Sequence, residues 1–245
     1  MLKLEFAVPS QVKEAQDRLY PLIIPVGTIE YHGPHCAYGC DGLIAQALAE
    51  KLAEEREVVL APTIWYSPAS YAVAGMDSGT IHVDSDCFET YVEYILKHLV
   101  FSGWKNTYLL IHHQYEDENL LPMTLACMKA GRKVIFEYME KTKGLGWWGK
   151  KENETFYETL KEGENPWYWI TVLPCMSKEA QRATGYDHAG KYETSMLMAL
   201  YPEAIKLELL PLGDEWFIQS AKEASKELGE KMVELSMKDL RNRIK

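Results

Sequence analysis

Short apolar runs of strand length alternate with longer amphipathic segments along this sequence, and this limits the possible folds more than any other feature. The apolar run 22–26 is closed by Gly27, and residues 42–56 then carry apolar side chains along one helical face. Further strands are predicted over residues 58–61, 108–111, 134–138 and 168–173. Such an alternation with short links predicts an α/β sandwich around a mostly parallel sheet.

The remaining helices are predicted from caps and from apolar spacing. Asp84 or Ser85 can cap a helix that Gly103 closes, because its apolar residues recur every three or four positions. Further helices are expected over residues 119–130, ended by Gly131, and over residues 193–200 and 215–243. Residues 144–167 break the pattern, and their many Gly, Lys, Glu and Trp residues indicate a long excursion that serves as a lid or as an oligomer contact.

Length, the absence of long apolar stretches and the net charge narrow the class of protein. The 245 residues contain no repeat or flexible linker, which predicts a single domain over residues 1–245. No apolar stretch approaches the roughly 20 residues of a membrane span, and the N-terminus lacks the features of a signal peptide, so we expect a cytoplasmic protein. With 26 basic and 36 acidic residues the net charge is −10, which argues against nucleic acid and favours a small-molecule substrate.

The first cluster of chemically active residues directly follows the first predicted strand. Glu30 and His32 are two positions apart, so in an extended chain they point to the same side, and Asp41 stands near the start of the next helix. Mixed oxygen and nitrogen ligands suit Zn²⁺, Mn²⁺ or Fe²⁺. The alternatives are that Asp41 only caps its helix and that Glu30 and His32 form an ordinary solvated pair.

Two further polar clusters and one cysteine pair also contain candidate functional residues. Residues 112–119 follow a buried strand with six polar groups, part of which caps the next helix. In residues 185–195, His188 adjoins Asp187 and is a plausible proton carrier. The five cysteines are an odd number and suit reduced thiols, and the Cys36-x-x-x-Cys40 spacing has no second pair to close a zinc site, so buried thiols are expected.

Three stretches of this sequence resemble the creatininase (creatinine amidohydrolase) family, over about residues 21–202. Residues 25–41, P-V-G-T-I-E-Y-H-G-P-H-C-A-Y-G-C-D, look like the family's most specific motif. The segments D-S-G-T-I at 77–81 and H-A-G-K-Y-E-T-S at 188–195 are similar to two further family segments. The resemblance implies a three-layer α/β/α sandwich, assembly as a homo-oligomer such as a hexamer, and a hydrolase site with two metals.

The resemblance also implies roles for individual residues. Glu30 and His32 would each hold one metal, Asp41 would bridge both, and His188 would contact substrate or move a proton. The family's second motif is altered here: aligned on its histidine, His113 is the metal ligand and Glu116 a catalytic residue, whereas the other register places Gln114 at the ligand position. We prefer the first register, because a strand end can absorb one residue as a bulge. The expected substrate-binding residues are Tyr115, Trp167, Asp187 and Glu193.

The leading hypothesis is therefore a metal-dependent hydrolase, with one or two divalent transition metals per chain, that opens a small polar ring. Metal-activated water would attack a carbonyl, either of a cyclic amide or of an inositol-derived cyclic diketone of the 3-dehydro-scyllo-inosose type. In the second case the leaving carbon must be stabilised as an enolate. The alternative from a different class is a non-catalytic or single-metal subunit that serves in binding or assembly.

Overall fold

The core of the molecule is a parallel sheet. The structure, a computed structural model, describes residues 1–113 and 121–245. Within these ranges five strands lie in the order β1-β3-β2-β4-β5 and every neighbouring pair is parallel. Their bounds are Leu2–Lys3 for β1, Leu22–Val26 for β2, Val59–Leu60 for β3, Thr107–Ile111 for β4 and Ile170–Pro174 for β5. The central strands β2 and β4 are buried along their whole length, as apolar runs in a parallel sheet should be.

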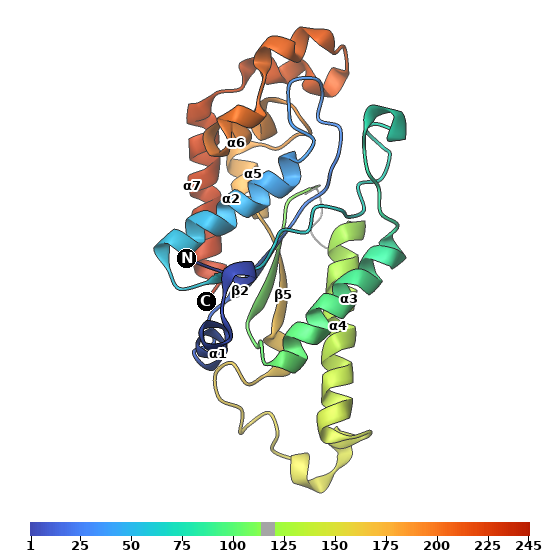
Figure 1. The fold of residues 1–245 in the computed structure, drawn as a ribbon, viewed down its shortest axis with the longest axis vertical. Helices are drawn as coiled ribbons and strands as arrows, with labels where there is room; N and C mark the ends of the chain where they lie inside the picture. Colours follow the sequence, from blue (N-terminus) through green and yellow to red (C-terminus); the bar gives the residue numbers. More distant parts are fainter. Residues whose placement is uncertain (114–120) are drawn as a thin grey trace.

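Helices cover both faces of the sheet, so the predicted three-layer sandwich is confirmed (Figure 1). Alternate side chains of a strand point to opposite faces: Ile23 and Leu110 pack toward α2, α6 and α7, whereas Ile24 and Leu109 pack toward α3 and α4. The α-helices are α1 (Pro9–Asp17), α2 (Cys40–Glu55), α3 (Ser85–Ser102), α4 (Pro122–Lys143), α5 (Lys178–Thr184), α6 (Lys191–Leu200) and α7 (Lys226–Arg243). Asp84 caps α3 and Gly103 ends it in the left-handed region, as predicted.

The second half of the chain departs from the predicted elements at α4. The strand predicted over 134–138 is wrong, because these residues continue the buried stripe of α4, and so is the helix end predicted at Gly131. Gly131 lies inside the helix, where a Cβ would approach the Ile170 side chain to 2.9 Å, so its absence lets α4 pack closely on β5. A short apolar run fits strand and helix equally well until its neighbours are known.

The C-terminal segment also differs from the prediction of one helix over 215–243. Residues Trp216–Glu223 form a 3-10 helix, η8, and α7 begins separately after Ser225, whose side chain accepts a hydrogen bond from the Leu228 backbone N–H. The other short 3-10 helices are η1 (Leu4–Phe6), η2 (Met76–Ser78), η3 (Trp147–Gly149), η4 (Lys151–Asn153), η5 (Pro166–Tyr168), η6 (Pro202–Ala204) and η7 (Leu207–Leu212). None of the helices in the described ranges is long and apolar enough to cross a membrane.

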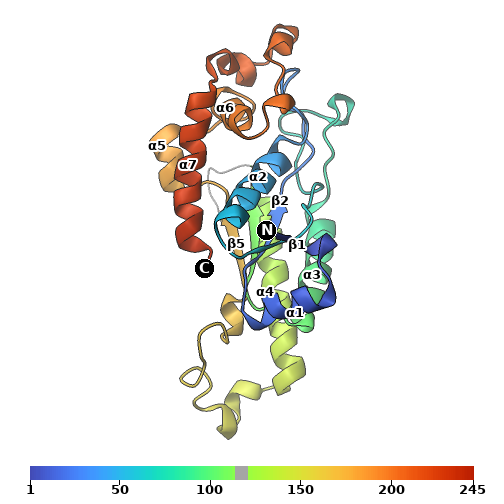
Figure 2. The same cartoon turned by 60° about the vertical axis from the view of Figure 1, so that its left-hand side comes forward.

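The excursion 144–167 lies at the far end of the molecule from the carboxyl ends of the strands (Figures 1 and 2). This follows from topology: β4 and β5 are parallel, so α4 must carry the chain back to the edge where strands begin. The excursion that follows α4 therefore starts at the amino edge of the sheet. The prediction that it forms a lid is wrong for the chain's own site, and its role as an oligomer contact stays a prediction.

Candidate metal centre

The predicted ligands lie at the carboxyl edge of the sheet, where β2 and β4 end side by side. Val26 and Ile111, the last residues of these two strands, are paired in register. The chain that follows β2 supplies Glu30 and His32, and the chain that follows β4 supplies two adjacent histidines. Ligands of an open α/β sheet usually bind at this edge.

Asp41 reaches the same point from the first turn of α2. Gly39 is the N-cap of this helix, and the helix begins at Cys40, so the capping alternative for Asp41 is wrong. The start of α2 also lies against the end of β2, because a Cβ on Gly27 would be only 2.2 Å from the backbone nitrogen of Gly42. This backbone contact places Asp41 beside the residues that follow β2.

Carboxylates and imidazoles alternate within the cluster. Asp41 Oδ2 lies 3.1 Å from Nδ1 of His113, and a Glu30 oxygen lies 3.4 Å from the same nitrogen. On the other side, His32 Nε2 lies 3.6 Å from Asp41 and 3.4 Å from Glu193, which enters from the first turn of α6. All five side chains are at most 7% exposed. Asp41 is therefore shared by both halves of the cluster.

Several of these buried atoms have no hydrogen-bond partner among the described residues. Both carboxylate oxygens of Glu30, Nε2 of His32 and Nε2 of His113 are in this state. The other nitrogen of His32 lies 2.9 Å from the Glu30 carbonyl, to which it must donate, so in the neutral ring, the form that binds a metal, Nε2 carries the lone pair. Buried unpaired polar atoms are costly, and unpaired carboxylate oxygens of Glu30 beside the imidazoles of His32 and His113 are what a divalent metal needs. The donor set fits one.

The charges of the cluster are strongly coupled. Burial raises the pKa of Glu30 to about 7. Burial would also raise the pKa of Asp41 and Glu193, but the neighbouring imidazoles outweigh it and hold both values below the ordinary range. Burial would lower the pKa of His32 and His113, but the carboxylates beside them raise it. Without a metal, protons on Glu30 and the histidines partly balance this buried charge.

We expect the metal-free protein to lose stability as the pH rises from about 5 to about 8. The pKa of Glu30 is about 7 in the folded chain, above its ordinary 4.5, so its stabilising effect is complete below 4.5 and lost as the pH rises through 7. The raised pKa values of His32 and His113 act in the same direction. Denaturant titration at both pH values should show that the free energy of unfolding falls by roughly 2–3 kcal/mol more in wild type than in Glu30→Gln. An equal loss in both proteins would contradict it.

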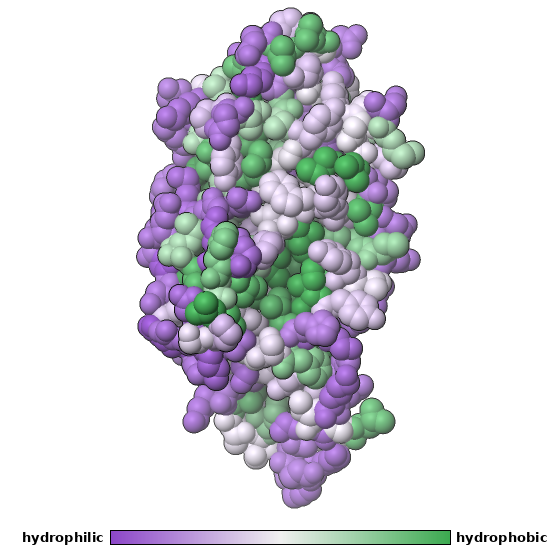
Figure 3. All heavy atoms as spheres, in the orientation of Figure 1, coloured by the Kyte–Doolittle hydropathy of each residue, from purple (hydrophilic) through white to green (hydrophobic). Residues whose placement is uncertain are grey.

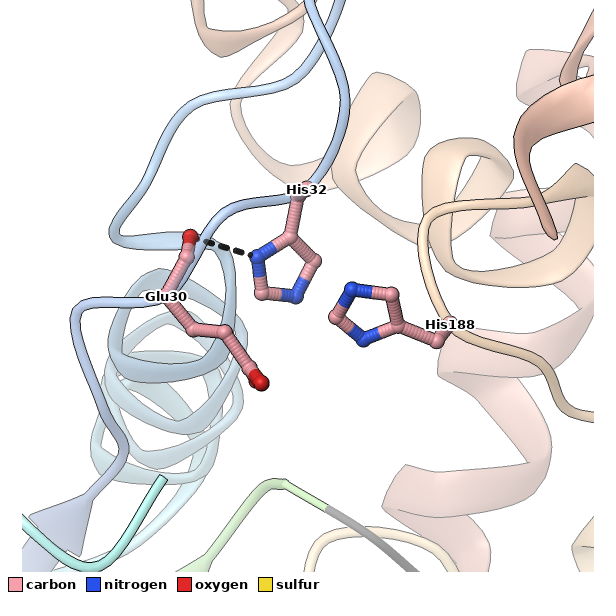
Figure 4. A group of neighbouring side chains, drawn as sticks. All are labelled: Glu30, His32 and His188. Atoms are coloured by element: carbon pink, nitrogen blue, oxygen red, sulfur yellow. Dashed lines mark hydrogen bonds between the residues drawn. The ribbon is translucent and has the colours of Figure 1, made fainter. Parts of the chain in front are cut away.

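His188 faces the cluster from the loop that precedes α6. Its ring centre lies 4.3 Å from that of His32, and Figure 4 shows both rings converging with the Glu30 carboxylate. Nε2 of His188 lies 2.9 Å from the Tyr31 carbonyl and donates to it, so Nδ1 is left as an acceptor. Burial and the His32 ring lower the pKa of His188, which therefore starts neutral and accepts a proton before it can donate one.

A cavity of about 650 Å³ opens above this cluster. Its described lining consists of Asp41, Ala72, Val73, His113, Leu121, Tyr186, Asp187, His188, Glu193, Trp216, Phe217 and Ser220. The lining thus combines acid and imidazole groups with aromatic and aliphatic side chains. The aromatic residues of η8 and the aliphatic side chains could not be predicted from the sequence, because apolar loop residues carry no chemical motif.

The other predicted site residues have different outcomes. Asp187 lines the cavity, but its two carboxylate oxygens accept the backbone N–H groups of Tyr192 and Glu193 at the start of α6. Trp167 precedes β5 at the opposite edge of the sheet and lines a separate pocket with Arg132 and other residues, so the fold does not bring it to this cavity. Tyr115 and Glu116, with Gln114, lie outside the described residues.

Sequence reasoning missed His112 as a member of the cluster. Its Nε2 lies 3.0 Å from Oε1 of Glu193 and 4.0 Å from Asp41. Donor atoms of Asp41, His112 and Glu193 lie close enough together to hold a metal, as do those of Glu30, Asp41 and His113. The adjacent histidines in the sequence were the available signal.

Two curated proteins are similar to this chain. One is the 3-dehydro-scyllo-inosose hydrolase of Thermotoga maritima, 27% identical over 198 residues, which cover 81% of this chain and 56% of that protein. The other is the creatinine amidohydrolase of Pseudomonas putida, 24% identical over 249 residues, which cover 91% of this chain and 88% of that protein. The match thus spans little more than half the length of the first relative.

Solved creatininases share the fold. A mutant complexed with creatine superposes with a TM-score of 0.71 at 20% identity, covering 99% of this chain and 96% of that one. A mutant of Zn-Zn type gives 0.70 at 19% identity and a manganese form 0.69 at 20%, each covering 99% of this chain and 98% of theirs. The sequence model of the family described as creatininase, creatinine amidohydrolase, matches residues 8–244. The chain therefore belongs to the creatininase family.

Proposed function

We propose that this protein is a metal-dependent hydrolase that opens a small polar ring by adding water to a carbonyl. The observation that carries the proposal is the convergence of buried, unpartnered oxygen and nitrogen donors on the floor of an open cavity. The family supports it, since both curated relatives are named as hydrolases. Creatininases solved in zinc and manganese forms support a divalent metal.

The ligands fall into two groups that share Asp41. Glu30, Asp41 and His113 would hold one ion, and Asp41 with Glu193 and a histidine would hold the other. A divalent metal supplies Lewis acidity, which polarises a carbonyl and makes water more acidic. The carbonyl of Glu30 fixes the tautomer of His32, so that its lone pair faces the cluster.

The chain's own part in proton movement belongs to His188. The Tyr31 carbonyl orients its ring, and its free Nδ1 can take a proton from the attacking water. The same nitrogen can then give that proton to a leaving nitrogen. Asp187 acts on this geometry indirectly, because its bonds to α6 hold Glu193 in place.

The substrate is either a cyclic amide or a cyclic diketone, and the two rings make different chemical demands. Departure of nitrogen from a cyclic amide needs a proton, which His188 can deliver. Departure of carbon from a cyclic diketone needs its electrons taken up by a neighbouring carbonyl held near a metal or a donor. One curated relative is named a creatinine amidohydrolase and the other a 3-dehydro-scyllo-inosose hydrolase, and the cavity offers both a proton carrier and a candidate metal centre.

Metal analysis tests the proposal directly. We expect protein purified without chelator to contain one or two transition-metal ions per chain, and added Zn²⁺ or Mn²⁺ to raise the melting temperature of the metal-free protein by linkage. Elemental analysis and thermal melts measure both. Less than about a tenth of an ion per chain, together with no shift, would mean that the cluster is not a metal site.

A substrate screen tests the ring. The family's asn-gly-his segment is altered around His113, so we expect weak or no hydrolysis of creatinine but measurable opening of another small ring. If His188→Ala destroys activity on a cyclic amide while a cyclic diketone is still opened at a substantial rate, the carbon–carbon hypothesis gains, because a leaving nitrogen must receive a proton whereas a leaving carbon must pass its electrons to a carbonyl. Creatinine turnover with kcat/KM of about 10⁴ M⁻¹s⁻¹ or more, typical of enzymes on their own substrates, would overturn this expectation.

We also propose that the chain works as a homo-oligomer. Figure 3 shows hydrophobic residues gathered in a hollow near the middle of one face, with hydrophilic residues around the rim. Large hydrophobic side chains such as Phe6, Leu145 and Trp216 are at least 79% exposed. Exposed apolar surface of this kind is common where copies of a chain meet.

A further inference from the structure

The short helix η8 forms one wall of the cavity, and the proposed function gives its contacts no role. It lies beside the loop that follows β2, at the top of the molecule in Figures 1 and 2. Phe217 and Ser220 of η8 line the cavity together with His188. The ring centres of Phe217 and His188 are 5.3 Å apart, with one ring edge-on to the other, which is an aromatic contact. The wall therefore packs directly against the proposed proton carrier.

A hydrogen bond joins the beginning of η8 to the chain between two predicted metal ligands. Tyr31 stands between Glu30 and His32, and its hydroxyl lies 2.6 Å from Oε1 of Glu215, the N-cap residue of η8. A phenol is protonated and a carboxylate ionised at neutral pH, so Tyr31 donates. The distance is typical of a charge-assisted O–H···O⁻ bond, which is stronger than a bond between neutral groups. The side chain of Tyr31 thus connects the candidate metal centre to the cavity wall.

The packing around this bond leaves room for it at two glycines. Gly33 has a φ of 75°, and a Cβ there would lie 2.8 Å from the fully buried Ile218 side chain of η8. A Cβ on Gly213 would lie 2.5 Å from Oε2 of Glu215. That oxygen is buried and has no hydrogen-bond partner in the part of the chain that the structure describes. Because a buried unpaired oxygen costs stability, the carboxylate points to a role beyond holding the fold.

Tyr31 acts on His188 from two directions. Its carbonyl accepts the N–H of His188 at 2.9 Å, which fixes one ring nitrogen. The torsion that turns a histidine ring has a broad energy minimum, so a single hydrogen bond leaves the ring free to tilt. The contact with Phe217 on η8 limits this tilt. The hydroxyl of Tyr31, through Glu215, keeps the beginning of η8 and with it Phe217 in place.

We propose that Tyr31 and Glu215 are positioning residues, whose hydrogen bond holds η8 so that Phe217 restrains the ring of His188. This rests on the proposed function for the role of His188 as a proton carrier. The bond lies outside the metal cluster, since neither side chain is among the groups that could hold an ion. Its loss should therefore loosen η8 and the His188 ring and leave the metal bound.

Hydrogen exchange of the full chain, measured by mass spectrometry, follows η8. We expect Tyr31→Phe and Glu215→Leu to speed exchange of the backbone amides of residues 216–223 by about tenfold or more, as loss of a hydrogen bond to a charged group allows. Peptides from α3 serve as the internal reference. Glu215→Gln keeps an acceptor oxygen and should exchange like wild type. Tyr38→Phe is the matched control, because the Tyr38 ring lies 6.3 Å from that of Tyr31 and its hydroxyl bonds the Ser78 carbonyl instead of η8.

Nuclear magnetic resonance of the histidine rings tests the positioning itself. The full chain is labelled with ¹⁵N in its seven histidines and loaded with Zn²⁺, and the His188 signals are identified by their loss in His188→Gln. We expect one tautomer, with the proton on Nε2, in wild type, Glu215→Gln and Tyr38→Phe. In Tyr31→Phe and Glu215→Leu the two ring nitrogens should shift toward the average of both tautomers. If Glu215→Leu does not fold, as judged by its thermal melt, Tyr31→Phe carries the test alone.

The outcomes separate this proposal from the proposed function, because neither measurement depends on turnover. Unchanged exchange in η8, or an unchanged His188 signal in Tyr31→Phe, overturns the positioning role and leaves the hydrolase proposal standing. Loss of metal from Tyr31→Phe alone also overturns it, since the side chain would then support the ligands. A wild-type protein that binds no metal overturns the hydrolase proposal, and the ring signals of the metal-free protein still show whether Tyr31 and Glu215 hold His188.

Discussion

Asp41→Ala should abolish hydrolysis, with a loss on the order of 10³-fold or more, comparable to removal of a principal catalytic side chain. The carboxylate of Asp41 lies between His32 and His113 and is shared by both halves of the cluster. Its loss removes the group that ties the two metal positions together. Steady-state kinetics and metal content of the variant measure the effect, and we expect both to fall together.

A matched capping variant separates this role from helix stability. Asp84 caps α3 by accepting the Asp86 backbone N–H, far from the cluster in the chain. Asp84→Ala should cost about 1 kcal/mol of stability and leave turnover intact. Turnover of Asp41→Ala at the wild-type rate, with a stability loss like that of Asp84→Ala, would rule out the bridging role.

His113→Ala should lose metal and activity together. The Nδ1 atom of His113 lies 3.1 Å from Asp41 and 3.4 Å from Glu30, so the variant leaves two buried carboxylates without their imidazole. Metal content, activity and the melting temperature with and without Zn²⁺ are the measurements. We expect less than one ion per chain and no detectable shift from added metal at this position.

Two control variants show whether the correct residue was chosen. His98→Ala changes an exposed histidine of α3 and should leave metal content, activity and melting temperature unchanged. Gln114→Ala should keep the metal and change the rate only modestly. If Gln114→Ala loses the metal while His113→Ala keeps it, the other register of this motif is the correct one.

The layers and the strand edge could be predicted from the sequence because both depend on local patterns. Residues 22–26 and 108–111 are apolar runs, and polar clusters follow each of them directly. Parallel strands end at one edge, so Glu30 and His32 were predictably close to the histidines that follow the later strand. The structure brings these residues together with Asp41 and Glu193.

The remaining features depend on contacts between segments that are distant in the chain. Alternation in an extended strand allows only one of two adjacent histidines to face a given side, yet the chain leaves the strand at Ile111 and bends at His113, so both histidines reach the cluster. Residues 134–138 are helical because their apolar side chains continue the buried stripe of α4. Trp167 could have been placed correctly, since the segment after a crossover helix starts at the amino edge.

The hydrogen bond between His188 and the Tyr31 carbonyl joins residues that are 157 positions apart. Such a contact cannot form while the C-terminal half of the chain is still being made or is not yet docked, because the intervening loop must close first. The centre is thus complete only once β2, β4 and α6 have met. Metal affinity then reports the finished tertiary structure, since an incompletely synthesised chain would lack Glu193 and leave one of the two ligand groups incomplete.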